Sequence, residues 1–341
     1  MTIGRKDSVT KSYMGEDAVF ADAFNYFLYQ GRQVLAPEDL KPLDTAQPGV
    51  FSGTGKAAGT AVEAVQKYRD VLKTAKVMKD GKATYLLLGV ENQSQVHYAM
   101  PVRNLVYDAL QYARQVEQIA ADHRRQCDWS GHSRGEYLSG FYKKDQLLPV
   151  ITLAIFFSPD RWDGPMTLHD MMSATDPELL KLVQDYRIHL IEPAAMEMED
   201  FEKLCSSLRE VLAFIKYSRD PEKLSKLLTQ DPHFEHLDRS AAMVISACTH
   251  TDLNIKEDEE AVNMCQAIEA MKRDSREAGV AEGRAEGRAE GRAEGKEEGM
   301  LIQARATAER LAAKGFEEEQ IAEILGYGLS VVRMWIYSDE Q

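Results

Sequence analysis

The chain has 341 residues, of which 44% are apolar and 28% charged, and its formal net charge is −14. This length and composition predict about two globular domains and exclude collagen, a fibrous rod and a chain that is disordered throughout. The longest apolar run, Val150 to Phe157, is far shorter than the roughly 18 to 20 residues that a membrane span needs. Because the first residues also lack the apolar stretch of a signal peptide, we expect a cytoplasmic protein with no membrane partner.

The negative charge is unevenly distributed along the chain. Residues 1–150 carry a net charge of +2, and residues 151–341 carry −16. Affinity for nucleic-acid phosphates comes mainly from Lys and Arg, so the composition argues against a passive coat on nucleic acid. The nearly neutral first part can still hold a local basic cleft, and an enzyme that acts on DNA is therefore not excluded.

The cysteines are dispersed, at Cys127, Cys205, Cys248 and Cys265. No two of them lie within four residues of each other, which is the spacing that a zinc ribbon or a redox pair requires. We expect four ordinary thiols and no zinc site.

The first predicted elements are a helix and a β-hairpin. Residues 16–30 place four apolar side chains on one helical face, and Gly31 is suited to end the helix. Residues 68–78 and 83–91 have the character of two strands. The Asp-Gly pair within residues 79–82 is a strong signal for a hairpin turn between them.

A crossover unit follows the hairpin. Residues 99–120 predict a long amphipathic helix, and residues 148–158 and 186–191 predict two buried strands. The apolar positions of that helix are Val102, Leu105, Val106, Ala109, Leu110, Ala113, Val116 and Ile119. A strand–helix–strand crossover beside a hairpin predicts an α/β fold with a mixed sheet flanked by helices, and residues 199–271 predict a helical annex.

Glycine recurs at every fourth position from Gly279 to Gly299, mostly separated by Arg-Ala-Glu. Each glycine costs a helix about 1 kcal/mol relative to alanine, and the repeat places like charges at i and i+4. A glycine stripe also lets two helices approach closely, and a period of four favours a right-handed coil. The segment is therefore either a flexible spacer or a helix that forms a homo-oligomer.

The last forty residues regain apolar periodicity. Residues 319–336 have the order of small, apolar and turn residues that is typical of a helix-turn-helix. Residues 300–341 hold only four basic against seven acidic side chains, and Arg333 is the one basic residue in the second helix. This tail is either a protein-interaction module or, with less support from its charge, a DNA-contacting one.

Two carboxylates are expected to meet at the open end of the hairpin. With a turn at residues 79–82, antiparallel partners have numbers that sum to about 161, which pairs Asp70 with Glu91. An all-oxygen site of this kind suits Mg²⁺, or Mn²⁺, with water completing the coordination. Gln93 lies two residues beyond Glu91 on the same strand face and can hold an attacking water. The alternative is that all three side chains are solvent-facing strand ends.

Several runs of residues resemble the Rpn-type recombination-promoting nucleases, transposase-like members of the PD-(D/E)XK nuclease family. The most specific are Glu-Asn-Gln-Ser at 91–94 and Tyr-Ala-Met-Pro-Val-Arg at 98–103. Tyr-Arg-Asp-Val-Leu-Lys at 68–73, Tyr-Asp-Ala-Leu-Gln-Tyr at 107–112 and Pro-Val-Ile-Thr-Leu at 149–153 also contribute. The resemblance covers roughly residues 1–275, and the repeat and terminal helices are similar to tails that this family carries.

The resemblance implies a restriction-endonuclease-like core in which Asp70 and Glu91 are the motif acids and metal ligands. Gln93 stands where the wider superfamily has lysine; an amide orients water but lends no positive charge to the transition state. Asp22 is the first candidate for the additional acidic metal ligand, with Glu16 and Asp17 as alternatives.

Three further residues are candidate DNA contacts: Lys73, Arg103 and Gln111. The alternatives are a salt-bridged surface helix for Arg103 and Gln111, and a solvated sheet edge for Lys73. The sequence thus divides into a nuclease core (1–195), a helical annex (196–276), the glycine repeat (277–299) and a helix-turn-helix-like tail (300–341).

The function expected from these features is a Mg²⁺-dependent DNA endonuclease that promotes recombination or mobile-element movement, and Gln93 in place of lysine is consistent with a low rate. A catalytically weak protein that assembles through the repeat and the tail is the main alternative. A DNA-binding factor that works through the tail is the third.

Overall fold

The computed structural model describes residues 3–43, 46–49, 65–68, 70–79, 82–127, 131–173, 176–253, 255–256 and 258–337. The Asp-Gly pair of the predicted hairpin turn lies outside the described residues. The chain forms two compact units, Met1–Ile268 and Glu269–Gln341. Within the described ranges, no helix combines the length and the apolar character needed to cross a bilayer.

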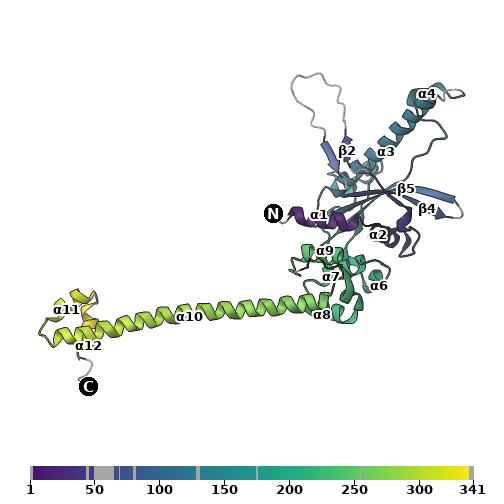
Figure 1. Ribbon diagram of the computed structural model, residues 1–341. Helices are drawn as coiled ribbons and strands as arrows, with labels where there is room; N and C mark the ends of the chain where they lie inside the picture. The colour runs from purple at the N-terminus through teal and green to yellow at the C-terminus, as the bar shows by residue number, and fades with distance from the viewer. Residues whose placement is uncertain are drawn as a thin grey trace, which may run out of the picture. The chain divides into compact units, whose positions relative to one another are not determined.

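A mixed five-stranded sheet lies at the centre of the first unit (Figure 1). Its strands, in spatial order, are β1 (Leu40–Pro42), β4 (Val71–Lys79), β5 (Lys82–Gln93), β6 (Val150–Phe156) and β7 (His189–Ile191). The β1–β4 and β4–β5 pairs are antiparallel, whereas β5–β6 and β6–β7 are parallel. The predicted mixed sheet flanked by helices is thereby confirmed. Two small ribbons accompany it, formed by β2 (Ala46–Gly49) with β3 (Val65–Tyr68) and by β8 (Leu237–Asp238) with β9 (Ala261–Val262).

Helices surround this sheet and form the annex. The α-helices that precede α10 (Met264–Ala312) are α1 (Ile3–Met14), α2 (Asp17–Tyr29), α3 (Met100–Gln126), α4 (Arg134–Ser139), α5 (Pro177–Leu180), α6 (Met198–Phe201), α7 (Leu208–Tyr217), α8 (Pro221–Gln230) and α9 (Arg239–Thr249). Short 3-10 turns occur at Pro37–Asp39, His169–Met171, Pro193–Ala195 and Pro232–His236. The helix expected at 16–30 is α2, and α1 before it was not predicted.

The main hydrophobic core lies between one face of the sheet and the annex. It contains Phe20 and Phe24 of α2, Leu88 and Val90 of β5, and many side chains of α7 and α9. Because side chains alternate along a strand, residues next to Leu88 and Val90, including Glu91, point to the opposite face. That opposite face is covered by α3, and this arrangement determines which polar residues can meet.

The burial of α3 differs from the prediction. The eight positions expected to form its apolar face are exposed or half buried, and Val102 is 39% exposed. Polar side chains face the protein instead, with Asn104, Asp108 and Gln111 all buried. Two hydrogen-bond donors explain this: Thr152 Oγ1 of β6 and Tyr186 Oη, from the segment before β7, each donate a hydrogen bond of 2.6 Å to the Asp108 carboxylate. A buried carboxylate with such donors is stabilised in a position that periodicity alone would give to an apolar residue.

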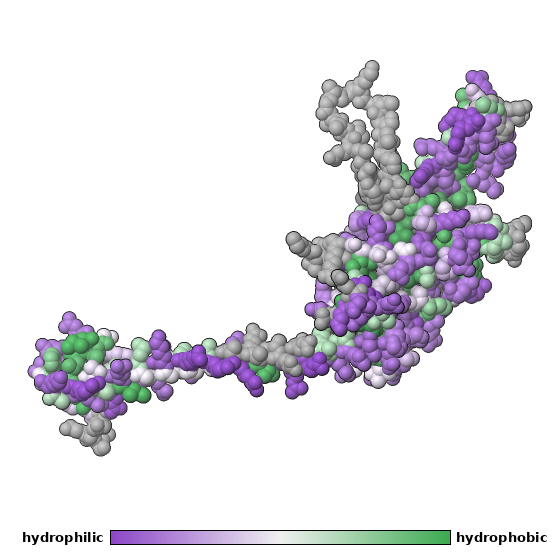
Figure 2. All heavy atoms as spheres, in the orientation of Figure 1, coloured by the Kyte–Doolittle hydropathy of each residue, from purple (hydrophilic) through white to green (hydrophobic). Residues whose placement is uncertain are grey.

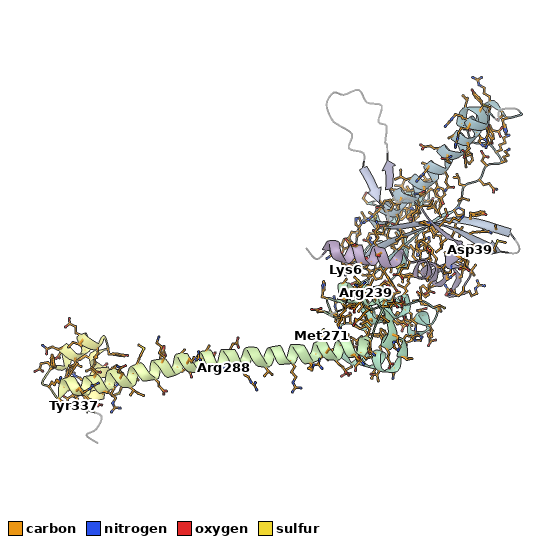
Figure 3. The ribbon with its side chains drawn as sticks, in the orientation of Figure 1. Lys6, Asp39, Arg239, Met271, Arg288 and Tyr337 are labelled. Atoms are coloured by element: carbon orange, nitrogen blue, oxygen red, sulfur yellow. The ribbon has the colours of Figure 1, made fainter. Side chains whose placement is uncertain are left out.

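The second unit consists of helices. The 49-residue α10 (Met264–Ala312) begins before the unit boundary and includes the whole glycine repeat. Arg288, in the middle of that repeat, projects into solvent (Figure 3). The end of α10 packs with α11 (Glu318–Leu325) and α12 (Leu329–Tyr337) around a small core of Ala308, Ile321, Val332 and Trp335. Figure 2 shows the apolar residues gathered over these last helices. Gly326, with a φ of 71°, makes the turn between α11 and α12.

Candidate active site

The hairpin register brings Asp70 and Glu91 to the same end of the sheet. Val71 pairs with Val90 and Leu72 with Gly89, so partner numbers sum to 161 as the sequence predicts. Asp70 directly precedes β4 and therefore lies next to Glu91 on the adjacent strand. Its Oδ2 accepts a hydrogen bond of 2.8 Å from the backbone N–H of Asn92. This bond holds the Asp70 carboxylate against the end of β5.

Glu91 lies on the α3 side of the sheet and is fully buried. Nη2 of Arg103, from the first turn of α3, is 3.0 Å from Glu91 Oε2. Nε of the same guanidinium donates a hydrogen bond of 3.1 Å to the Tyr107 hydroxyl, one turn further along the helix. Arg103 therefore bridges a buried carboxylate and a phenol through two of its nitrogens.

The electrostatics link these groups to Asp70. Burial raises the pKa of the Asp70 carboxyl, while the Asn92 N–H bond and the Arg103 charge partly offset that rise. Burial alone would lower the pKa of Arg103, but the charge of Glu91, the Tyr107 contact and the charge of Asp70 raise it. The charges of Glu91 and Asp70 therefore both act on the Arg103 guanidinium.

A cavity of about 310 Å³ opens beside this group. Its walls include Asp70, Gln93, His97 and Arg103, together with Asp7 of α1. Glu91 contacts the cavity wall through Arg103. The structure therefore brings together four residues that the sequence singled out: Asp70, Glu91, Gln93 and Arg103. Their combination of two acids, an amide and a cation beside a cavity suits the binding of a hard cation with a phosphate.

Asp22 belongs to a different part of the first unit. Its Oδ2 accepts hydrogen bonds from the backbone N–H of Ser206 (2.8 Å) and from the Ser206 hydroxyl (2.7 Å). The backbone N–H of Cys205 lies 3.0 Å from both of its carboxylate oxygens. These bonds fix the turn before α7 and assign Asp22 a structural role, so the contacts give no support to a metal-ligand role. Of its two alternatives, Glu16 is exposed and Asp17 pairs with Lys73.

Two of the expected DNA contacts are turned away from solvent. Lys73 pairs with Leu88, on the sheet face opposite Glu91, and its side chain is 4% exposed. Its Nζ donates hydrogen bonds of 2.6 Å to the Gly15 carbonyl and to Asp17 Oδ1, and lies over the Phe20 ring. Gln111 is buried on the sheet-facing side of α3. Both residues stabilise the fold in these positions, and neither can reach a phosphate from them.

Two further residues act on this site and were not among the candidates from the sequence. Tyr107 accepts a hydrogen bond from Arg103 and holds its guanidinium. Lys11 of α1 also acts on the Asp70 carboxyl and lowers its pKa. The signal for Tyr107 was its spacing of four residues from Arg103, which places the two on one helical face.

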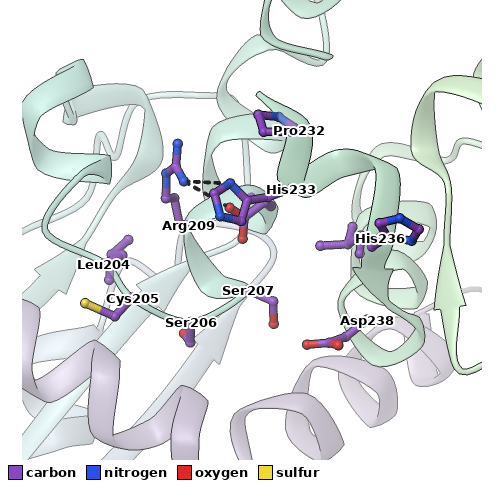
Figure 4. Close-up of a pocket in the computed structure, with 11 residues that line it drawn as sticks. Leu204, Cys205, Ser206, Ser207, Arg209, Pro232, His233, His236 and Asp238 are labelled. Atoms are coloured by element: carbon purple, nitrogen blue, oxygen red, sulfur yellow. Dashed lines mark hydrogen bonds and ion pairs between the residues drawn. The ribbon is translucent and has the colours of Figure 1, made fainter. Parts of the chain in front are cut away.

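A second group of metal-ligand types lies in the annex. Ligand atoms of Glu210, Asp231 and His233 lie within 4.8 Å of one another beside a cavity of about 580 Å³ (Figure 4). Arg209 contacts all three of them, at 2.6 Å from Asp231, 3.3 Å from His233 and 3.5 Å from Glu210. These contacts with Arg209 form an ion-pair network that joins α7 to the 3-10 turn after α8.

Comparisons of the chain with protein-family models, with curated proteins and with solved structures give no match.

Proposed function

We propose that the chain is a Mg²⁺-dependent DNA endonuclease with a restriction-endonuclease-like core, whose strand breaks promote recombination or mobile-element movement. The observation that carries the proposal is the pairing of Asp70 with Glu91 at the open end of the β4–β5 hairpin, beside a cavity lined by Gln93 and Arg103. The resemblance of residues 91–94 and 98–103 to Rpn-type nucleases supports the same function.

The donor set fits a divalent cation. The guanidinium of Arg103 forms an ion pair with Glu91 and acts on Asp70 only through its charge, so the two carboxylates and this one cation have a net negative charge. Mg²⁺ commonly takes one or two protein carboxylates and keeps several waters, and Mn²⁺ has similar preferences. A metal held by Asp70 and Glu91 would acidify a water and polarise a phosphodiester oxygen. Gln93 would orient that water, and Arg103 at the cavity wall would contact the phosphate.

The direct test is conversion of supercoiled plasmid to the open-circular form by the purified full chain. We expect cutting with Mg²⁺ or Mn²⁺ and none with excess EDTA, because in the proposed site a metal would supply both the charge stabilisation and the activated water. Electrophoresis of the plasmid after timed incubation measures the rate. Cutting at the same rate in EDTA, or no cutting with either metal, would contradict the proposal.

A second function, assembly of a catalytically weak protein through α10, is favoured by one observation. The side-chain positions of the glycines from Gly279 to Gly299 face open space in a helix of 49 residues. Such a helix is marginal alone, since each glycine costs about 1 kcal/mol. A second copy of α10 against the glycine face would bury this surface.

The double substitution Gly287→Ala and Gly291→Ala tests assembly. If two copies pack through this face, the added methyl groups hold the helices apart, and we expect self-association to weaken by about tenfold or more, which is 1.4 kcal/mol. Light scattering across a concentration series measures the mass. Ala289→Ser, on the opposite side of the helix, is the matched control. A helix that stands alone would instead keep its mass and gain about 0.5–1 kcal/mol of stability per substitution.

DNA contact through the tail has less support. Arg333 of α12 forms an ion pair of 2.5 Å with Glu318, and the Tyr337 hydroxyl donates a hydrogen bond to the same carboxylate. Met334 and Tyr337 are exposed on this helix. An exposed face of apolar side chains with its arginine neutralised suits a protein partner better than a phosphate backbone.

A further inference from the structure

Arg103 occupies a position between the protein interior and the cavity. One nitrogen of its guanidinium contacts the buried Glu91 and another contacts Tyr107. The side chain is nevertheless 31% exposed and forms part of the cavity wall. It is therefore placed to contact either a buried carboxylate or a molecule that enters the cavity.

The burial of Glu91 explains why a cation lies beside it. A carboxylate that is fully removed from water is strongly destabilised unless an opposite charge and hydrogen-bond donors accompany it. Arg103 supplies a positive charge at 3.0 Å. This ion pair offsets part of the cost of burying the Glu91 carboxylate and holds its side chain at the end of β5.

A divalent cation and the guanidinium cannot both take the same Glu91 oxygen. Like charges a few ångströms apart in a partly buried site repel by several kcal/mol at an effective dielectric constant of about 20. Arg103 has room to move, because the cavity lies beside it and a long arginine side chain can extend toward solvent.

We propose that Arg103 is an exchangeable counter-ion: it neutralises Glu91 until a divalent cation binds there, and it then turns into the cavity to contact a DNA phosphate. This inference rests on the proposed nuclease function and goes beyond it, because it makes metal binding and DNA binding depend on each other. It also places beside the phosphate the positive charge that Gln93 does not provide.

Calorimetric titration of the full chain with Mn²⁺ tests the first half of the exchange. We expect Arg103→Gln to bind Mn²⁺ at least about tenfold more tightly than the parent, because the metal no longer displaces a competing cation. Mn²⁺ should also raise the melting temperature of Arg103→Gln by more than it raises that of the parent. Arg103→Lys keeps the charge and should remain near the parent affinity. Arg114→Gln removes an exposed charge from the same helix and is the matched control.

DNA binding tests the second half. The affinity for a 30-base-pair duplex, measured by fluorescence anisotropy with Ca²⁺ to limit cleavage, should fall severalfold in Arg103→Gln. Without a divalent cation the same substitution should change the affinity little, because Arg103 then stays with Glu91.

The outcomes separate the inference from the nuclease proposal. A parent that binds Mn²⁺ together with an Arg103→Gln variant that binds it equally or more weakly overturns the exchange alone. An equal loss of DNA affinity with and without Ca²⁺ does the same. If neither protein binds Mn²⁺, the metal site itself fails, and the nuclease proposal fails with it. If Arg103→Gln folds only when Mn²⁺ is present, the metal is replacing the arginine charge, as the exchange requires.

Discussion

Replacing Glu91 by alanine is expected to lower Mg²⁺-dependent plasmid nicking by about 10³-fold or more, since removal of one group that stabilises charge in a transition state commonly has this effect. Asp70→Ala should cause a loss of the same order, because each carboxylate supplies part of one metal site. The measurement is the initial rate of open-circular product at saturating Mg²⁺. The expected loss corresponds to about 4 kcal/mol of transition-state stabilisation.

The loss should not come from unfolding. Glu91→Ala removes a buried charge and leaves Arg103, which is 31% exposed and can be hydrated. Glu91→Gln keeps the shape of the side chain and should lose as much activity as Glu91→Ala, because an amide is a poor ligand for Mg²⁺ compared with a carboxylate. Glu117→Ala, an exposed position on α3, is the control and should cut at the parent rate. Variants of Asp70 and Glu91 that still nick at the parent rate would show that these acids are not the catalytic centre.

The hairpin register could be predicted because it depends on local chemistry. An Asp-Gly turn fixes which residues oppose each other, and the observed sum of 161 places Asp70 next to Glu91. The same alternation could have placed Lys73 correctly. Lys73 is three residues from Asp70, which directly precedes β4, so the two side chains point to opposite sides of the sheet, and Lys73 lies on the side of α2.

The orientation of α3 could not be predicted from periodicity. The apolar positions indicated one buried face, but Asn104, Asp108 and Gln111 form another, at a spacing of four and three residues. What decides between them is the chemistry of the sheet, where Thr152 and Tyr186 donate to Asp108. Those partners are 44 and 78 residues away in the sequence, so no local pattern contains them.

The contacts of Asp22 are even harder to predict from local sequence, because its partners Cys205 and Ser206 are about 180 residues away. Substitution of Asp22 is the second change for which we expect a large effect, here on the stability of the fold. We expect Asp22→Ala to lower the free energy of unfolding by about 2–4 kcal/mol, since two backbone N–H groups and a hydroxyl lose a charged acceptor in a buried place. For a unit of this size the melting temperature should fall by roughly 5–10 °C. Calorimetric unfolding measures both quantities.

The Mn²⁺ affinity of Asp22→Ala, compared with that of the parent, decides whether Asp22 is a structural residue or a metal ligand. If it only fixes the turn before α7, Asp22→Ala should bind Mn²⁺ with the parent affinity at a temperature where it is folded. Asp22→Asn retains one acceptor oxygen and should lose less stability than Asp22→Ala. Glu16→Ala, in the exposed turn before α2, should leave both stability and Mn²⁺ affinity close to those of the parent. A stable Asp22→Ala protein with Mn²⁺ affinity reduced tenfold or more would instead make Asp22 a metal ligand, and would require α2 to move toward Asp70 when the metal binds.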